Sequence, residues 1–179
     1  MNSSRIILDL CGGTGAWSQP YRDAGYDVRL LTLPIDIRLL HRLDDPIHGI
    51  LAAPPCTVFA NSGARWPRTD AQMIEGLSVV DACLRAVFIY QPMWWALENP
   101  VGELSRYLGK PTMYFDPCDY GDPYTKRTGL WGAFNLPKLN PVAPVKKSPI
   151  HHMAPGPERA AKRSVTPAGF AHAFFEANP

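Results

Sequence analysis

Cys56 is the cysteine in this sequence whose neighbours suit a reactive thiol. It follows Pro54 and Pro55, which end an apolar segment and stiffen the backbone that carries the thiol. A polar, glycine-containing segment, residues 57–69, comes after it. A lone cysteine is most often a small buried hydrophobe, whereas a thiol exposed at a strand end can act as a nucleophile. This setting favours the nucleophile.

Glu98 is a carboxylate that could act beside that thiol. It follows the apolar run 94–97 and precedes Asn99 and Pro100. Because parallel strands present their carboxyl ends at one edge of a sheet, we expect Glu98 at the same edge as Cys56. Burial there would favour the protonated carboxyl, which can hydrogen-bond a ring nitrogen. The structural alternative is a carboxylate that caps a helix or pins a loop.

A glycine-rich segment, DLCGGTGAW (residues 9–17), lies between a predicted strand and a predicted helix. Its glycines let the backbone approach a ligand closely, and the first turn of the helix offers free N–H donors. The segment fits neither GxGxxG nor the GK[ST] ending of a phosphate loop. By itself it predicts a ligand site only weakly, and a purely structural turn is the alternative.

Positive charge gathers late in the chain. Residues 1–123 contain 10 Lys and Arg against 14 Asp and Glu, whereas residues 124–179 contain 8 against 2. The pair Lys126–Arg127 opens this basic region. Such asymmetry favours a surface that faces a polyanion, and a solvated tail is the alternative.

The elements that must position these residues alternate between strand and helix. Apolar runs that end at glycine or proline predict strands over 5–10, 26–31, 48–53, 94–97, 113–116 and 128–132. Helical patterns cover 16–24, 70–91, 102–108 and 167–178, and Asp70 is expected to cap the longest. We therefore predict an α/β fold with a mostly parallel sheet and helices on both faces. The proline-rich segment 135–157 is expected to be an extended arm.

Bulk properties bound the class of protein. At 179 residues the chain has the size of one domain. No run reaches the roughly 18 apolar residues of a membrane span, and the first residues lack signal-peptide architecture. We expect a cytoplasmic protein of a bacterial or phage-infected cell, without a membrane partner. The four cysteines form no CxxC pair, so neither a metal nor a disulfide framework is expected.

Taken in order, these segments resemble the cytosine carbon-5 DNA methyltransferase family, above all its short phage-type members. DLCGGTGAW is similar to the family's DLFxGxGGF, PPCTVFANSGAR to its PCQPFSxxGxR, LENP to its ENV motif, and TKRTGLW partly to its QxRxR motif. The segment RSVTPAGFAHAFFEA is a fainter likeness to the closing motif. The resemblance implies a Rossmann-like fold, the methyl donor S-adenosylmethionine with S-adenosylhomocysteine as product, and DNA as partner.

The resemblance also implies three sets of site residues. The catalytic set is Cys56, Glu98, Asn99, Arg127 and Pro55. The cofactor set is Asp9, Leu10, Cys11, Gly12, Gly13, Thr14, Gly15, Trp17, Asp36, Ile37 and Pro54. The nucleic-acid set is Arg65, Arg68, Lys126, Lys146, Lys147 and Arg163.

The family gives these positions distinct roles. Cys56 would attack carbon 6 of a cytosine that is flipped out of the duplex, and Glu98 would contact its ring nitrogen 3. Asn99 would order the loop around the nucleophile. Trp17 would stack on the cofactor adenine, and Asp36 would accept its amino group.

The sequence departs from the family pattern at several points. Thr32 stands where an acidic residue usually contacts the cofactor ribose, Pro100 replaces the valine of ENV, and Gly129 replaces the second arginine of QxRxR. Lys126 or Arg65 could supply the missing donor. The largest departure is the lack of a separate target-recognition domain before the closing motif.

The departures shape the predicted domains and specificity. We expect a cofactor-binding and catalytic core over 1–132, a basic proline-rich arm over 133–162, and a C-terminal helix over 163–179 that returns to the core. Base readout needs a rigid element in a groove, whereas phosphate contacts need only placed charges, so specificity is expected to be short or relaxed.

Two alternatives stay open. The same chemistry could act on a free cytosine nucleotide or on RNA, which the missing recognition domain favours and the basic C-terminal region disfavours. The chain could also be a catalytically inactive nucleic-acid-binding relative, although it keeps both Cys56 and Glu98. The oligomeric state, monomer or homodimer, is left open.

Overall fold

A computed structural model describes residues 5–61, 67–145 and 159–179, except for the side chains of 159–161. Its helices and strands, in chain order, are β1 (Ile6–Leu10), α1 (Gln19–Asp23), β2 (Asp27–Leu31), η1 (Ile37–Leu39), β3 (Ile47–Ala52), α2 (Asp70–Tyr90), β4 (Trp94–Pro100), α3 (Ser105–Leu108), β5 (Met113–Phe115), η3 (Pro117–Asp119), β6 (Thr128–Ala133), α4 (Arg159–Ser164) and α5 (Ala168–Ala177).

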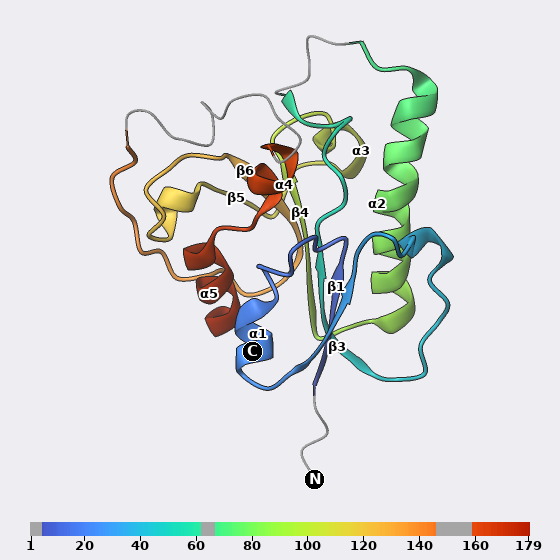
Figure 1. Cartoon of the computed structure of the whole chain (residues 1–179), viewed down its shortest axis with the longest axis horizontal. Coiled ribbons are helices and arrows are strands. Elements are labelled where there is room, and N and C mark those ends of the chain that lie inside the picture. Colours follow the sequence, from blue (N-terminus) through green and yellow to red (C-terminus); the bar gives the residue numbers. More distant parts are fainter. Residues whose placement is uncertain (1–4, 62–66, 146–158) are drawn as a thin grey trace.

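The six strands form one sheet in the order β2-β1-β3-β4-β6-β5 (Figure 1). The first four run parallel to one another, and β6 runs antiparallel to both β4 and β5. The predicted α/β fold with a mostly parallel sheet is thereby confirmed. Apolar patterning does not predict the reversal at β6, because strand direction depends on the connections.

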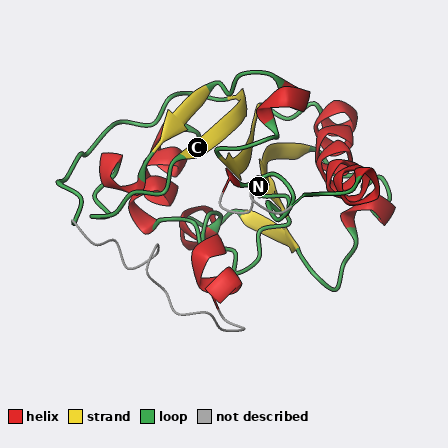
Figure 2. Ribbon diagram, turned by 90° about the horizontal axis from the view of Figure 1, so that it is seen from above, coloured by secondary structure: helices red, strands yellow, loops and turns green. Residues whose placement is uncertain are grey.

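Helices cover both faces of the sheet (Figures 1 and 2). On one face α2 packs over a cluster that includes Ile50 and Leu97. On the other face α1 and α5 enclose a second, aromatic cluster that includes Trp94 and Phe170. Because successive strand residues point to opposite faces, β4 contributes Trp94 and Ala96 to one cluster and Leu97 to the other.

Three parallel strands end at the same level of the sheet. Leu10 of β1 pairs with Ala52 of β3, which in turn pairs with Leu97 of β4. The segments that follow these residues therefore leave at one edge. Ligand sites of α/β sheets form at such an edge, in the loops that follow the strands.

The N-cap of the long helix α2 lies one residue earlier than the sequence predicts. Thr69, not Asp70, is the N-cap: its hydroxyl accepts from the Gln72 backbone N–H (3.2 Å), and the Gln72 side chain accepts from the Thr69 N–H (3.0 Å). This reciprocal pair is a capping box. Asp70 instead lies in the first turn, where its charge suits the helix dipole.

The C-terminal region contains a helix that the sequence does not predict. α4 crosses the expected boundary at residue 163 between the arm and the last helix. Residues 134–145 form neither helix nor strand apart from a single bridge between Asn140 and Tyr120. In the part of the chain that the structure describes, no helix is long and apolar enough to span a membrane.

Candidate active site

Cys56 lies in the connection that leaves β3, here named the Cys56 loop (residues 53–61). Pro54 is buried, Pro55 is exposed and Cys56 is half-buried. The buried side chain of Asn99, on β4, donates a hydrogen bond from Nδ2 to the Pro54 carbonyl oxygen (3.0 Å). β4 therefore holds the backbone that leads into the thiol.

The far end of the Cys56 loop is held by the segment after β4. The Phe59 carbonyl accepts from the Glu103 N–H (2.8 Å), and the Asn61 N–H donates to the Val101 carbonyl (3.3 Å). A Cβ on Gly102 would lie 1.9 Å from the Phe59 carbonyl oxygen, so only glycine permits this approach. The backbone on both sides of the thiol is thus fixed by β4 and by the segment that follows it.

Glu98 and Lys126 form an ion pair beside this loop. Lys126 Nζ lies 3.8 Å from Glu98 Oε1, and the two side chains are 15% and 16% exposed. The strand register explains the meeting: Glu98 lies opposite Leu130 and therefore shares a face with Thr128, two residues along β6. Lys126 continues this alternation two residues before Thr128.

Arg127 points away from Glu98, and its position argues against the predicted catalytic role. Its Nη1 lies 3.2 Å from Asp116 Oδ2, and its guanidinium carbon lies 5.4 Å from the centre of the Tyr114 ring. Neighbouring residues of an extended chain face opposite sides, so Lys126 and Arg127 cannot both turn toward Glu98. Lys126, expected to contact nucleic acid, is instead the cation beside the carboxyl.

The neighbouring charges shift the pKa of the Cys56 thiol. Burial raises the pKa of the Cys56 thiol, negative Glu98 raises it further, and positive Lys126 and Arg163 lower it. Burial also raises the pKa of Glu98, which Lys126 opposes. Charges influence one another strongly only at close range, so the structure brings Cys56 and Glu98 into one site. A raised pKa favours a Glu98 carboxyl that can donate a hydrogen bond.

Arg163, predicted from the sequence to contact nucleic acid, also lowers the pKa of the Cys56 thiol through its positive charge. It was expected to contact phosphates, yet its charge reaches the Cys56 thiol and its side chain is half-buried. It belongs to α4, which lies near the ends of β4 and β6 in Figure 1. It opens the segment 163–177 that resembles the family's closing motif, but that likeness does not indicate a charge acting on Cys56.

The connection after β1, named the glycine loop (residues 11–18), turns around a buried carboxyl. Asp9 Oδ2 accepts from the Ser18 hydroxyl, and a Cβ on Gly12 would lie 2.1 Å from Asp9 Oδ1. Burial raises the pKa of Asp9 to about 6. Asp9 therefore shapes the loop from within the core, and Gly13 and Gly15 complete the turn with φ values of 56° and 72°.

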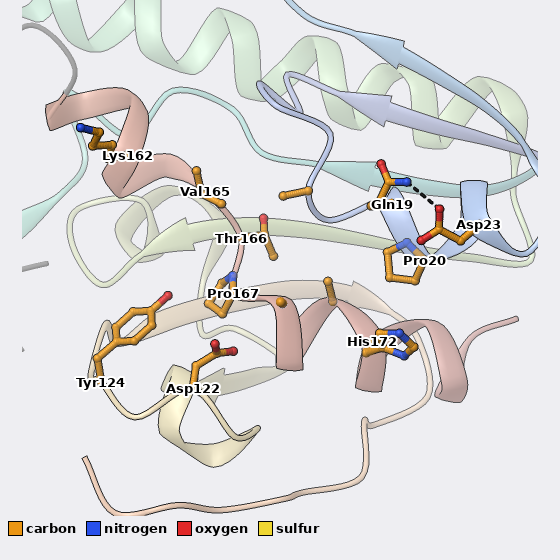
Figure 3. A pocket seen from close by; sticks show the side chains of 13 residues that line it. Gln19, Pro20, Asp23, Asp122, Tyr124, Lys162, Val165, Thr166, Pro167 and His172 are labelled. Atoms are coloured by element: carbon orange, nitrogen blue, oxygen red, sulfur yellow. Dashed lines mark hydrogen bonds between the residues drawn. The ribbon is translucent and has the colours of Figure 1, made fainter. Parts of the chain in front are cut away.

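A cavity of about 690 Å³ adjoins the end of the glycine loop (Figure 3). Its walls come from the end of the glycine loop, from α1, from the turn before β6, and from α4, α5 and the segment between them: Ala16, Gln19, Pro20, Asp23, Asp122, Tyr124, Lys162, Val165, Thr166, Pro167, Ala168, Ala171 and His172. The volume suits a small molecule. Among the described residues its lining includes Ala16 but none of residues 9–15.

Three side chains predicted to bind the cofactor are buried in the core. Trp17, Leu10 and Ile37 are 2%, 0% and 4% exposed. The Trp17 ring lies against Phe170 and Phe174 of α5, with ring centres 6.0 and 5.5 Å apart. Because so little of this ring is exposed, its position argues against stacking on an adenine. Trp17 joins the glycine loop to α5.

Cys11 and Pro54 are also turned toward the protein. The Cys11 thiol interacts with Cys83 on α2, which lowers the pKa of Cys11. Pro54 is buried where its carbonyl meets Asn99. Thr14 is exposed on the loop, where its backbone and hydroxyl are free to meet a ligand.

Asp36 lies beyond β2 and is held by an ion pair. Its carboxylate accepts from the Arg38 backbone N–H (3.0 Å) and from Arg38 Nε (2.9 Å) and Nη2 (2.7 Å). Arg38 also bonds Glu75 of α2 (2.6 Å). These contacts lower the pKa of Asp36 and keep it ionised, a state that can accept a further hydrogen bond from an amino group.

The residues predicted to bind nucleic acid are only partly placed. Arg65, Lys146 and Lys147 lie outside the described residues. Arg68 Nη2 donates to the Ala60 carbonyl oxygen (3.0 Å), so this guanidinium braces the Cys56 loop. In the regions that are described, no group of three His, Cys, Asp or Glu is arranged to hold a metal ion.

Comparison with known proteins identifies the architecture. No protein-family model and no curated protein sequence matches the chain. A solved structure with an assigned DNA modification methyltransferase role, encoded within an Escherichia coli prophage, matches with a TM-score of 0.55 and 22% identity, over 78% of this chain and 53% of that one. This is the Rossmann-like fold of a methyltransferase.

A second solved structure, a DNMT2 variant from Spodoptera frugiperda, matches with a TM-score of 0.39 and 17% identity, over 81% of this chain and 56% of its own. The chain thus spans about half the length of both proteins. The methyltransferase fold agrees with the order of elements predicted from the sequence.

Proposed function

We propose that this chain is a DNA (cytosine-5)-methyltransferase that uses S-adenosylmethionine and forms a covalent bond from Cys56 to the base. The observation that carries the proposal is the meeting of a half-buried thiol, Cys56, with the largely buried carboxyl of Glu98 at one sheet edge. Lys126 supplies a cation to the same site. The prophage relative supports DNA as the substrate class.

The chemistry follows from these groups. Carbon 5 of cytosine is too weak a nucleophile to accept a methyl group directly. Attack of Cys56 Sγ on carbon 6 forms an S–C bond and pushes electron density toward carbon 5, and Glu98 stabilises the developing charge by hydrogen bonding to ring nitrogen 3. After methylation, carbon 5 loses its proton to water, the 5,6 double bond re-forms, and the S–C bond breaks to release the Cys56 thiolate.

The cavity beside Ala16 supports a small-molecule site next to the glycine loop. S-adenosylmethionine would supply the methyl group when bound there. Ala16 and the first turn of α1 would contact it from the loop side, and the segment 165–168 would close the other side. Asp36 would accept the adenine amino group. Asp36 does not line the cavity, so the proposed cofactor would have to extend from the cavity to Asp36.

DNA recognition is proposed to rest mainly on charge. The arm over 133–162 replaces a target-recognition domain, and it lies between the core over 1–132 and the C-terminal segment. The resulting specificity is short or relaxed. Methylation of a free cytosine nucleotide is the competing activity. An assay that offers both DNA and the nucleotide separates the two activities.

Methyl transfer from labelled S-adenosylmethionine to duplex DNA, to deoxycytidine monophosphate and to RNA tests the proposal. We expect label in DNA, with 5-methylcytosine as the product and bisulfite sequencing showing a short or degenerate site. Cys56→Ala should abolish transfer, and Glu98→Gln should lower it about 10²- to 10⁴-fold because the proton donor is weakened.

Cys118→Ala is the matched control, since Cys118 is also a partly exposed free thiol and lies outside the site. It should retain activity. Unchanged methyl transfer by Cys56→Ala would exclude covalent catalysis by this residue. Label found only in deoxycytidine monophosphate would show that the substrate is the free nucleotide and not DNA.

A further inference from the structure

A carboxylate, Asp122, lies in the wall of the cavity beside the glycine loop. The turn that carries it is fixed, because the Asp122 N–H donates to the Pro117 carbonyl (3.1 Å) and the Asp122 carbonyl accepts from the Tyr124 N–H (2.6 Å). Its half-buried side chain accepts, through Oδ2, from the backbone N–H of Gly169 in the first turn of α5 (2.9 Å). This bond involves one of the two carboxylate oxygens, and a carboxylate can accept about four hydrogen bonds. Asp122 can therefore hold α5 and still accept a hydrogen bond from a ligand.

The Asp122 end of the cavity is the end that leads toward the active site. Tyr124 also lines this end. Lys126, the partner of Glu98, follows two residues later, so the backbone at Tyr124 lies within about 7 Å of the backbone at Lys126. Asp23, the other carboxylate of the lining, belongs to α1 and lies on the opposite side of the cavity in Figure 3. A ligand that delivers a group to a base beside Glu98 would therefore direct its reactive portion toward the Asp122 end.

The charges of the cavity wall suit the amino-acid portion of the proposed methyl donor. In S-adenosylmethionine, the chain that carries the sulfonium ends in an α-ammonium group and an α-carboxylate. The ammonium has N–H donors that form charge-assisted hydrogen bonds with a carboxylate, whereas the sulfonium has no such donor. Besides Asp122, the wall includes the cation Lys162. Charges of both signs in one wall complement a group that itself carries both.

We propose that Asp122 binds the α-ammonium group of the methyl donor and thereby holds the methionine portion at the end of the cavity that leads toward Glu98. This proposal rests on the proposed function, which assigns S-adenosylmethionine to this cavity. It adds a binding residue outside the cofactor set that the resemblance implies. A purely structural role, the bond from Gly169 that holds α5, is the alternative.

Isothermal titration calorimetry of the full chain without DNA tests the proposal with three ligands. S-adenosylhomocysteine keeps the ammonium, its desamino analogue lacks only that group, and methylthioadenosine lacks the whole amino-acid portion. The test variant is Asp122→Asn, which loses the charge but keeps an oxygen that can accept from the Gly169 N–H. Asp23→Asn is the matched control, because Asp23 lines the same cavity but is exposed and accepts from Gln19 on the same helix (2.7 Å).

We expect Asp122→Asn to raise the Kd of S-adenosylhomocysteine about five- to twentyfold, because a charge-assisted hydrogen bond is replaced by a weaker one. The Kd values of the desamino analogue and of methylthioadenosine should change less than about twofold, since neither ligand has the group that Asp122 binds. For the native chain, removal of the amino group should weaken binding by a factor similar to that of Asp122→Asn. Asp23→Asn should bind all three ligands as the native chain does.

An unchanged Kd of S-adenosylhomocysteine in Asp122→Asn would overturn the proposal. Equal weakening of all three ligands would also overturn it, because the shape of the cavity would then be the cause. If Asp122→Asn does not fold, the native chain alone decides: equal Kd values for S-adenosylhomocysteine and its desamino analogue would contradict a bond to the ammonium.

The proposed function fails in a different way. A native chain that binds no S-adenosylhomocysteine would overturn both this proposal and the assignment of the cofactor. Absence of methyl transfer to DNA, with the expected pattern of ligand binding intact, would overturn the proposed function and leave the role of Asp122 in place.

Discussion

At the scale of single residues, burial of the Asp9 carboxyl beneath the glycine loop lowers the stability of the folded chain. One carboxylate oxygen accepts from Ser18, while the other is buried without a partner. Burial raises the pKa of Asp9 from 3.8 to about 6, so the folded state holds the proton more tightly than the unfolded state. As pH rises from about 4 to about 6, ionisation of Asp9 therefore lowers the free energy of unfolding, by about 3 kcal/mol in total.

Asp9→Asn should consequently be more stable than the native chain at pH 8, by about 1–3 kcal/mol, because no charge is then buried. The difference should shrink toward zero near pH 4. Urea unfolding between pH 4 and pH 8 measures it, with Asp81→Asn on the exposed face of α2 as the control. A variant that is less stable than native at pH 8 would show that the Asp9 charge is paired rather than isolated.

Sequence motifs predicted the type of each reactive group but not which neighbour would meet it. Cys56 follows β3 and Glu98 lies near the end of β4, and the edge that these strands share is predictable from the α/β pattern. The choice of Lys126 over Arg127 depends on the register of β6, and adjacent cations in the sequence carry no sign of it. The charge of Arg163 acts on Cys56 from a distant segment, which local patterns do not encode.

At the scale of elements, β4 acts as the brace of the active site. Asn99 holds the start of the Cys56 loop, and the segment containing Gly102 holds its end. Strands and the long helix α2 could be predicted because their apolar patterns are regular. α4 could not, because its short, basic sequence adjoins a proline-rich segment and lacks an apolar stripe.

Gly102→Ala should lower methyl transfer about tenfold or more, because the new Cβ would force the Phe59 carbonyl and the thiol away from their positions. The KM for DNA should change much less than kcat. Steady-state kinetics beside Lys110→Ala, an exposed position on the connection after α3, provide the comparison. Native kcat in Gly102→Ala would show that the Cys56 loop tolerates displacement.

At the scale of the whole molecule, the chain combines a methyltransferase-like fold with a basic C-terminal region, and it spans about half the length of the structures that it matches. Recognition through phosphates releases counterions, so affinity for duplex DNA should fall steeply with salt. For about five phosphate contacts, Kd should weaken about 10²- to 10³-fold between 50 and 200 mM salt. Fluorescence anisotropy measures this, and a Kd that barely changes would contradict a charge-based mode of binding.

The covalent bond from Cys56 is the central claim of the proposed function. DNA containing 5-fluorocytosine tests it most directly, because a fluorine on carbon 5 cannot leave as the proton does and the adduct is trapped. With S-adenosylmethionine present, the native chain and Cys118→Ala should form a complex with this DNA that survives denaturing electrophoresis, and Cys56→Ser should form none. A trapped complex in Cys56→Ser, or none in a native chain that methylates ordinary DNA, would contradict the claim.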